Sequence, residues 1–155
     1  PKYSTFNARS GSLGTSPLWK KRFQSQRAII PASGFHEWTG GKGRKQCYNI
    51  HPVDSAIAFA GLYEFWDFQG DIVPSFTIVT LPPHPNFRHI HPKSIPLMLR
   101  PEDFELWLDP QQTNTDPLQH LLKTKIGEPL SVEPIKSPEK LEIAGAVEKI
   151  EADDA

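Results

Sequence analysis

The sequence predicts an α+β fold that is mainly β, with a few short helices. Its 155 residues suffice for one domain, and their 16 prolines and 10 glycines disfavour long helices. Apolar, β-branched and aromatic residues occur in short runs bounded by Pro or Gly, which is typical of strands. Hydrophobic residues make up 37% of the chain, so we expect a buried core and not a disordered chain.

The first half of the chain contains most of the strand patterns. Glycines in the stretch 39–43 supply the positive φ angles of a hairpin turn, so the runs on either side should pair. The polar stretch 66–74, with Gly70 near its middle, is expected to be a loop. The expected strands cover residues 27–38, with a turn before Gly34-Phe35, then 46–50, 56–65 and 75–81.

The second half of the chain predicts a loop and two short helices. Residues 82–96 contain five prolines and three histidines, which indicates an ordered loop, and a short strand is expected at 97–99. Pro and acidic residues followed by apolar residues at helical spacing predict a helix over 100–108, and a second one is expected around 118–125. Beyond Pro138, a three-residue apolar spacing suits an amphipathic helix and the Glu and Lys content suits a loose tail, and both alternatives stay open.

Charge is distributed unevenly along the chain. Residues 1–50 carry nine Lys or Arg and one acid, whereas residues 101–155 carry five Lys or Arg and thirteen acids. A basic N-terminal third can bind a polyanion, whereas the acidic C-terminal third would repel one. Any nucleic-acid site should therefore lie in the first two thirds of the chain. Charge alone favours the alternative that the basic residues are solvated surface.

Several classes of protein are not expected from this composition. No run of about 18 apolar residues occurs and the first residues show no signal-peptide pattern, so a cytoplasmic protein without a membrane partner is expected, nucleoid-associated if the source is bacterial. The single cysteine, Cys47, cannot form an internal disulfide or a cysteine cluster for zinc. It lies in a strand pattern, so we expect it to pack in the core.

Glu37 and the histidines of the 82–96 loop are candidates for chemistry. A glutamate between a histidine and a tryptophan is most often a surface carboxylate, but burial beside aromatic groups would raise the pKa of Glu37 and let it exchange protons near neutral pH. His89 and His91 would point the same way in an extended segment, yet catalytic zinc needs a third protein ligand. We expect no metal site and no cofactor.

Five short segments occur in a characteristic order. They are Asn-Ala-Arg-Ser at 7–10, the stretch 27–38 with its Gly-Phe-His-Glu-Trp, the strand patterns 58–64 and 75–80, and Ile90-His91 with Ile95-Pro96. In this order and spacing over residues 7–109, they closely resemble the SRAP family, the SOS-response-associated peptidases. The resemblance implies a compact, mainly β fold with a few peripheral helices over residues 1–133, followed by an acidic tail or short helix at 134–155.

The resemblance also implies a function in the DNA damage response. Family members recognise abasic sites in single-stranded DNA and crosslink to them through an N-terminal cysteine, exposed by self-removal of the initiator methionine, which forms an imine and then a thiazolidine. The family places this cysteine several dozen residues before the Asn-Ala-Arg motif, but six residues precede Asn7 here. We therefore expect the nucleophile to lie outside this chain, and whether the chain has the family's peptidase and lyase-type activities stays open. The alternative is a non-catalytic single-stranded DNA-binding or interaction module derived from the same fold.

Individual site residues follow from the same resemblance. Glu37 is implied as the catalytic carboxylate that shuttles protons, and His91 as the histidine that assists sugar ring opening or contacts the lesion phosphate. Lys93 stands where the family usually has an arginine, so it keeps the charge but loses the bidentate fork. The implied DNA-binding residues are Asn7, Arg9, Thr80 and Lys93.

Overall fold

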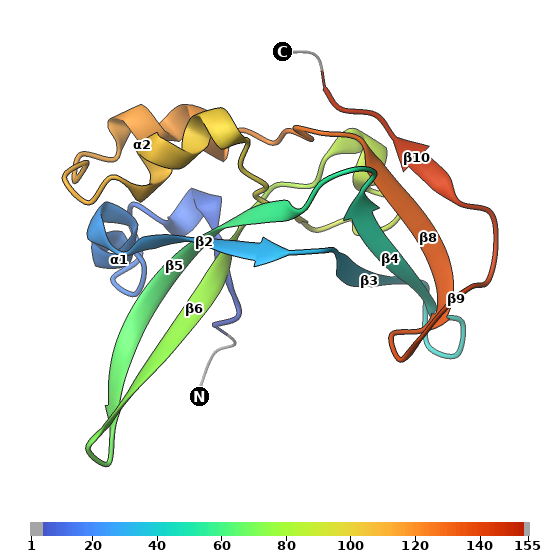
Figure 1. Cartoon of the computed structure of the whole chain (residues 1–155), viewed down its shortest axis with the longest axis horizontal. Helices are drawn as coiled ribbons and strands as arrows, with labels where there is room; N and C mark the ends of the chain where they lie inside the picture. The colour runs from blue at the N-terminus through green and yellow to red at the C-terminus, as the bar shows by residue number, and fades with distance from the viewer. Residues whose placement is uncertain (1–4, 154–155) are drawn as a thin grey trace. The chain divides into compact units, whose positions relative to one another are not determined.

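The chain forms two compact units, each assembled from segments that are separate in the sequence. The first unit comprises Pro1–Ile30, Ala58–Leu81 and Pro96–Lys123, and the second comprises Pro31–Ile57, Pro82–Ile95 and Thr124–Ala155. The structure, a computed structural model, describes residues 5–153 (Figure 1). Strands predominate over short helices in these residues, which confirms the expected mainly β fold.

A sheet with strand order β1-β6-β5-β2 is the centre of the first unit, and β7 also pairs with β6. Its strands are β1 (Asn7–Arg9), β2 (Arg27–Ala32), β5 (Ile57–Phe68), β6 (Asp71–Leu81) and β7 (Ile95–Pro96). β5 and β6 form a long antiparallel hairpin, whereas β1 runs parallel to β6. The sequence prediction of a short strand at 97–99 corresponds to an isolated bridge between Phe59 and Met98.

The β5–β6 hairpin corrects the expectation of a polar loop at 66–74. Both strands continue to a two-residue turn at Gln69 and Gly70, whose φ angles are 55° and 93°. Two adjacent residues with positive φ make the tight turn that matches the twist of a hairpin. The apolar and aromatic residues of this stretch favour extended backbone, and this preference outweighs the acidic residues among them.

Short helices complete the first unit. They are the α-helices α1 (Lys20–Ser25) and α2 (Phe104–Leu108) and the 3-10 helices η1 (Ser10–Ser12), η3 (Pro101–Asp103) and η4 (Asp116–Leu122). η3 and α2 together confirm the helix expected at 100–108, and η4 covers part of the one expected at 118–125, as a 3-10 helix. Helix α1 was not predicted, because its only buried residue is Phe23 and it shows no apolar periodicity.

Arg27 joins the ends of α1 and α2 inside the core of the first unit. Its side chain is buried, with 7% of the residue exposed. The guanidinium donates hydrogen bonds to the carbonyl oxygens of Phe23 at 2.8 Å, Gln24 at 2.7 Å, Trp107 at 2.6 Å and Asp109 at 2.6 Å. These carbonyls lie at helix ends, where no intrahelical donor is available. Burial lowers the pKa of Arg27, and the charge of Asp109 opposes this effect.

The second unit contains an antiparallel sheet with strand order β10-β8-β4-β3, to which β9 adds on β8. Its strands are β3 (Phe35–Thr39), β4 (Gln46–Pro52), β8 (Leu130–Ser137), β9 (Lys140–Ile143) and β10 (Glu148–Ile150), and it also includes the 3-10 helix η2 (Pro85–Phe87). The turn between β3 and β4 has Gly40 and Gly43 at positive φ, as expected for the hairpin. Cys47 is buried in β4, which confirms its expected packing in the core.

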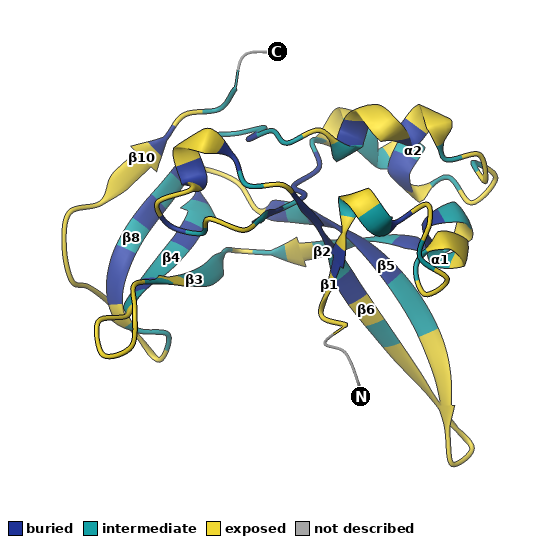
Figure 2. Ribbon diagram, turned by 180° about the vertical axis from the view of Figure 1, so that it is seen from behind, coloured by how far each residue is buried: buried dark blue, intermediate teal, exposed yellow. Residues whose placement is uncertain are grey.

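The C-terminal segment forms strands and not the helix or loose tail expected beyond Pro138. The apolar residues with the three-residue spacing are Leu141, Ala144, Val147 and Ile150. Ile150 is buried whereas Leu141 and Val147 are about half exposed, so they do not share a buried helix face. β9 instead returns along β8 from the turn at Ser137, and β10 pairs with β8 as well. Figure 2 shows the alternation of buried and more exposed positions along β4 and β8. The division of the chain at residue 133 stays a prediction.

No helix within residues 5–153 combines the length and the apolar character needed to span a bilayer.

Candidate functional site

Glu37 and His91 lie together in the second unit. Glu37 is on β3, opposite Tyr48 of β4, and His91 belongs to the proline-rich loop. The Oε2 atom of Glu37 is 4.0 Å from Nε2 of His91, and the two side chains are 23% and 27% exposed. Both side chains are therefore partly buried but still reached by solvent.

Contacts with β3 position the loop that carries His91. The hydroxyl of Thr39 donates a hydrogen bond to the carbonyl oxygen of His89 at 3.2 Å. The rings of Phe35 and Phe87 pack with their centroids 6.3 Å apart. Both ends of β3 therefore hold the loop, and the distance between Glu37 and His91 depends on these two contacts.

A backbone carbonyl determines which ring nitrogen of His91 carries a proton. Its Nδ1 is 2.8 Å from the carbonyl oxygen of Ser94. A carbonyl oxygen accepts hydrogen bonds and never donates them, so Nδ1 carries a proton in this geometry. Nε2 is then the nitrogen that faces Glu37, 4.0 Å from its Oε2 atom.

Burial makes Glu37 a weaker acid than an ordinary glutamate. Desolvation raises the pKa of Glu37, although the charge of His91 and a hydrogen bond with the backbone of Trp38 both lower it in part. A raised pKa makes a carboxyl group a stronger base, which favours a role in proton transfer. The Glu37–His91 pair is therefore the best candidate for proton transfer in the second unit.

Asn7, Arg9 and Thr80 come together in the first unit. Parallel pairing of β1 with β6 sets Arg9 beside Thr80 and Asn7 beside Ile78. Asn7 and Arg9 are exposed, and the residue between them, Ala8, is fully buried, so the two exposed side chains share one face of the sheet. This face offers an amide and a guanidinium, both of which can donate hydrogen bonds to phosphate oxygens.

Lys93 occupies an exposed bend of the second unit, two residues after His91. The predicted site residues are thus divided between the units: Glu37, His91 and Lys93 belong to the second, and the other three to the first. Sequence reasoning did not identify Thr39 and Ser94 as positioning residues. Ser94 acts through its main-chain carbonyl, which leaves no signal in the sequence.

A second polar cluster in the same sheet contains a carboxyl group whose pKa is lowered, whereas the pKa of Glu37 is raised. Glu133 accepts a hydrogen bond from Nδ2 of Asn49 at 2.9 Å and lies 3.1 Å from Nε2 of His51. The contacts with Asn49 and His51 lower the pKa of Glu133. Burial lowers the pKa of His51, but its hydrogen bonds with the Pro52 carbonyl and Glu133 outweigh this effect, so the net shift is upward.

Substitutions of Glu37 and Glu133 should change the pH dependence of stability with opposite signs. The raised pKa of Glu37 means that the folded state binds this proton more tightly, so ionisation at higher pH costs stability. Glu37→Gln should raise Tm at pH 7, and this gain should vanish below the ordinary glutamate pKa of about 4.3. Glu133, with a lowered pKa, contributes stability above its unfolded pKa and loses it as the pH falls through its folded pKa.

Glu133→Gln should therefore lower Tm at pH 7, with the difference fading in acid. Thermal melts of the two variants and the unsubstituted chain across the acid and neutral range measure both effects. Equal signs for the two variants at pH 7 would contradict the assignment of Glu37 as the desolvated carboxylate.

Comparisons with known proteins agree with this architecture. The family model for the SOS response associated peptidase (SRAP) matches residues 1–138. The abasic site processing protein YobE of Bacillus subtilis is 36% identical over 123 residues, which cover 77% of this chain and 56% of the relative. The abasic site processing protein YedK of Escherichia coli is 33% identical over 103 residues, covering 66% of this chain and 46% of the relative. The chain thus spans about half the length of these relatives.

Solved structures with a similar fold also exist. A crystal structure of a protein from Bacteroides thetaiotaomicron superposes with a TM-score of 0.77 at 26% identity, covering 86% of this chain and 59% of that one. A protein from Bordetella bronchiseptica gives a TM-score of 0.73 at 21% identity, over 84% of this chain and 65% of that one, and shows the fold alone. Together with the family match over most of its length, these similarities confirm the expected relationship: the chain belongs to the SRAP family.

Proposed function

We propose that this protein recognises abasic sites in single-stranded DNA as part of the DNA damage response, and that Glu37 and His91 move protons at the lesion. The observation that carries the proposal is the partly buried Glu37 carboxyl, with its raised pKa, 4.0 Å from a histidine nitrogen whose ring is oriented by Ser94. The names of the relatives, which describe abasic site processing, support the same conclusion.

The reaction that fits this pair is attack of an amine on the aldehyde of an opened abasic sugar. The nitrogen forms a bond to the carbonyl carbon, and one of its protons moves to the oxygen, which becomes a hydroxyl group. The second nitrogen proton then moves to this hydroxyl as the C–O bond breaks, so that water leaves and an imine is formed. A neighbouring thiol then adds to the imine carbon: sulfur forms the bond to carbon, and the proton that the thiol loses ends on the nitrogen, which completes a thiazolidine. Glu37 would accept the proton from nitrogen and return it to the departing oxygen.

The amine and thiol of this reaction belong, in the family that the chain resembles, to an N-terminal cysteine. The residue at the first position of these 155 is Pro1. Cys47 does not replace that cysteine, because it is buried and because burial, and then the charge of Glu139, raises the pKa of its thiol. In this proposal, the contribution of these 155 residues is DNA contact and proton transfer.

Binding to DNA should rest on the exposed side chains of β1 and on Lys93. Arg9→Ala should weaken binding to single strands and reduce the slope of log K against log salt by about 0.7, the contribution of one phosphate contact. Fluorescence anisotropy over a range of salt concentrations measures both. Arg100→Ala is the matched control, since Arg100 lies in the same unit and its guanidinium is 3.1 Å from Glu102. An unchanged slope in Arg9→Ala would show that Arg9 contacts no phosphate.

The proposed recognition is tested by comparing three labelled DNAs: a single strand with one abasic site, the same strand intact, and the intact duplex. We expect the 155-residue protein to bind the abasic strand most tightly, with the preference retained in the presence of excess duplex. Equal affinity for the abasic and intact strands would rule out lesion recognition by this chain and leave a general single-strand binding module.

A further inference from the structure

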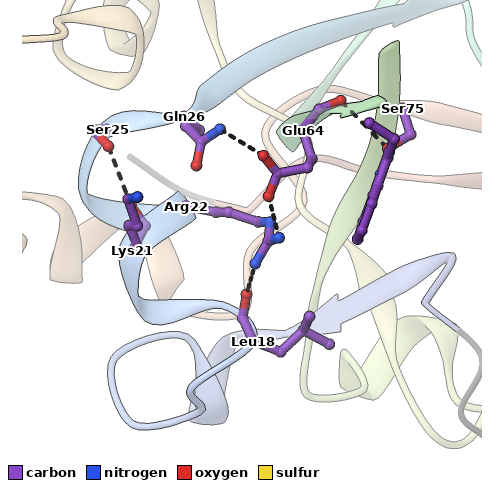
Figure 3. A network of polar contacts seen from close by, with 8 residues as sticks. Leu18, Lys21, Arg22, Ser25, Gln26, Glu64 and Ser75 are labelled. Atoms are coloured by element: carbon purple, nitrogen blue, oxygen red, sulfur yellow. Dashed lines mark hydrogen bonds and ion pairs between the residues drawn. The ribbon is translucent and has the colours of Figure 1, made fainter. Parts of the chain in front are cut away.

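Partly buried polar networks occur in both units. In the first unit, Glu64 forms an ion pair with Arg22 and accepts a hydrogen bond from Nε2 of Gln26 at 3.4 Å (Figure 3). Arg22 also donates a hydrogen bond to the carbonyl oxygen of Leu18. These contacts join β5 to helix α1 and the residues beside it, and they lie outside the candidate site. A network in the second unit, by contrast, reaches the candidate site.

His84, near the start of the loop that carries His91, is the centre of this second network. It is buried, with 7% of the residue exposed. Its Nδ1 accepts a hydrogen bond from the backbone N–H of Asn86 at 3.2 Å, and its Nε2 lies 3.1 Å from Oδ1 of Asp153. Because Nδ1 is an acceptor, the proton of the ring is on Nε2, which donates a hydrogen bond to the Asp153 carboxylate.

The Asp153 carboxylate is also held from a second direction. Its Oδ2 accepts a hydrogen bond from the backbone N–H of Ile126 at 2.8 Å, and the N–H of Asp153 donates to the Ile126 carbonyl at 2.9 Å. Ile126 itself is fully buried. Asp153 is therefore fixed against the core of the second unit, and both of its carboxylate oxygens are in use.

His84 in turn caps the 3-10 helix η2. The hydrogen bond from Asn86 to its ring is the side-chain cap of this helix, and the N–H of Phe87 donates to the His84 carbonyl at 3.0 Å. The Phe87 carbonyl then accepts a hydrogen bond from the backbone N–H of His91, also at 3.0 Å. The position of η2 therefore determines where the backbone of His91 lies.

Phe87 also links η2 to the strand that carries Glu37. Its ring is fully buried and packs against Phe35, which is two residues before Glu37 on β3. A displacement of η2 would thus move His91 and disturb the contact of the loop with β3. The 4.0 Å separation between Glu37 and His91 depends on where η2 is held.

A second acid of the C-terminal segment contacts the same loop. Oε2 of Glu148, on β10, is 2.8 Å from Nε2 of His89. The strand register places Glu148 in the same cross-strand row as Phe35, so both side chains project from the sheet face that contacts the loop. Residues 148–153 therefore contact the loop at two points.

The two contacts differ in strength because they differ in burial. The side chains of His89 and Glu148 are 52% and 47% exposed, and an ion pair between such exposed groups contributes little because water screens it. The His84 side chain is only 8% exposed, and a buried donor without its acceptor loses a hydrogen bond that water does not readily replace. Asp153 is therefore the more important of the two acids.

We propose that Asp153 is a positioning residue for His91: it holds His84, and His84 fixes η2 and the loop beside Glu37. Glu148 supports the same loop through His89. Both acids lie beyond residues 1–138, which match the family model, so this support comes from outside the matched region. The expected effect on chemistry rests on the proposed function of Glu37 and His91, whereas the positioning itself can be measured without DNA.

NMR of the 155-residue protein, labelled with ¹⁵N-histidine, measures this positioning. Long-range ¹H–¹⁵N spectra at about pH 8, where an ordinary imidazole is mostly neutral, distinguish which ring nitrogen carries the proton. In the unsubstituted protein we expect the proton of His84 on Nε2 and that of His91 on Nδ1. Asp153→Ala should remove the preference of His84 for Nε2 and shift the ring signals of His91.

Glu151→Ala and Glu64→Ala are the matched controls, and both should leave the His91 signals unchanged. Glu151 belongs to the same C-terminal segment but lies 3.0 Å from Lys149. Glu64 resembles Asp153 in having two side-chain partners and in being 27% exposed, against 33% for Asp153. Its substitution shows what the loss of a comparable network does when that network lies in the first unit.

His84→Asn makes the cap of η2 independent of Asp153. The asparagine side chain can accept the hydrogen bond from the Asn86 N–H, as N-cap residues do, but it ends short of the position of the His84 Nε2 atom. Asp153→Ala should therefore shift the His91 signals on its own and have little further effect when combined with His84→Asn. Equal shifts in both backgrounds would show that Asp153 acts by another route and would overturn the proposal.

Asp153→Asn gives a test that does not depend on Asp153→Ala folding. Asparagine keeps the size of the side chain but has a single acceptor oxygen, so it cannot bond to His84 and to the N–H of Ile126 at once. The His91 signals should move in the same direction as in Asp153→Ala, but less. The proposal is also overturned if these signals match those of the unsubstituted protein in Asp153→Asn and in any folded Asp153→Ala.

The consequence for chemistry is measured separately, by adduct formation with abasic DNA after a cysteine-bearing N-terminal segment is joined ahead of residue 1. Asp153→Ala should slow the reaction of the bound complex by about tenfold, as expected for a slightly misplaced group, and by no more than His91→Ala does. Affinity for DNA should change little. If the His91 signals shift but the rate does not, the positioning holds and the proposed role of His91 in chemistry fails. Unshifted signals overturn the positioning, whatever the rate.

Discussion

Glu37→Gln is expected to slow the chemical step at an abasic site by roughly 10²–10⁴-fold, the usual cost of removing a general acid–base group. Gln keeps the size and most hydrogen bonds of Glu but has no proton to exchange. Affinity for abasic single-stranded DNA should change little, because the proposed DNA contacts lie on other residues. The variant should therefore bind abasic DNA with nearly unchanged affinity but react much more slowly.

The measurement requires a protein in which a cysteine-bearing N-terminal segment, of the kind that the family resemblance implies, is joined ahead of residue 1. Adduct formation with abasic DNA is followed on denaturing gels at saturating protein, so that the rate refers to the bound complex. Glu133→Gln, a glutamate of the same sheet, is the matched control and should leave this rate unchanged. His91→Ala should slow the reaction less, since water can partly replace an assisting group.

The pH dependence provides a further check on Glu37. A carboxyl whose pKa is raised by burial should produce an inflection in the pH–rate profile at a higher pH than the pKa of an ordinary glutamate, and Glu37→Gln should lack it. If Glu37→Gln abolished DNA binding and left the rate per bound complex unaltered, Glu37 would be a contact residue and the assignment would be wrong.

Arg27→Met should lower the free energy of unfolding by about 3–5 kcal/mol, as expected when a buried polar network loses its charged member. The substitution leaves four carbonyl oxygens at the ends of α1 and α2 without their donor, and the hydrogen bonds to two of them, Phe23 and Trp107, are buried. Arg27→Lys should recover only part of the loss, because a single ammonium group does not span the positions that a guanidinium reaches.

Urea unfolding monitored by tryptophan fluorescence measures this effect, because Trp107 is fully buried beside the network. Arg100→Ala, which removes a more exposed arginine with a single ion pair to Glu102, is the control and should have little effect. A loss below about 1 kcal/mol in Arg27→Met, comparable with an average hydrogen bond, would show that the carbonyls find other partners.

Much of the local structure followed from the sequence. The turn between β2 and β3, the glycine-containing hairpin to β4 and the helix at 100–108 were all predicted, because glycine, proline and apolar spacing act on backbone within a few residues. The family could also be identified from the order of five short segments, and the match over residues 1–138 confirms it.

The secondary-structure predictions failed where the local sequence has only a weak or mixed preference for one secondary structure. Residues 66–74 were expected to form a polar loop with Gly70 near its middle, yet cross-strand pairing extends the hairpin to Gln69 and Gly70. Beyond Pro138, the apolar spacing resembled a helix, but pairing with β8 makes strands there. Strand pairing between distant residues adds hydrogen bonds and contacts that no local pattern records.

For the candidate site, sequence motifs predicted which residues take part, but the environment of these residues depends on the folded structure. Glu37, His91 and Arg9 were identified from motifs, and a raised pKa for Glu37 was expected only on the condition of burial. The structure supplies that burial, the 4.0 Å distance to His91 and the Ser94 carbonyl that orients the ring. Desolvation and charge interactions depend on distance through space, and these residues meet only when the chain has folded.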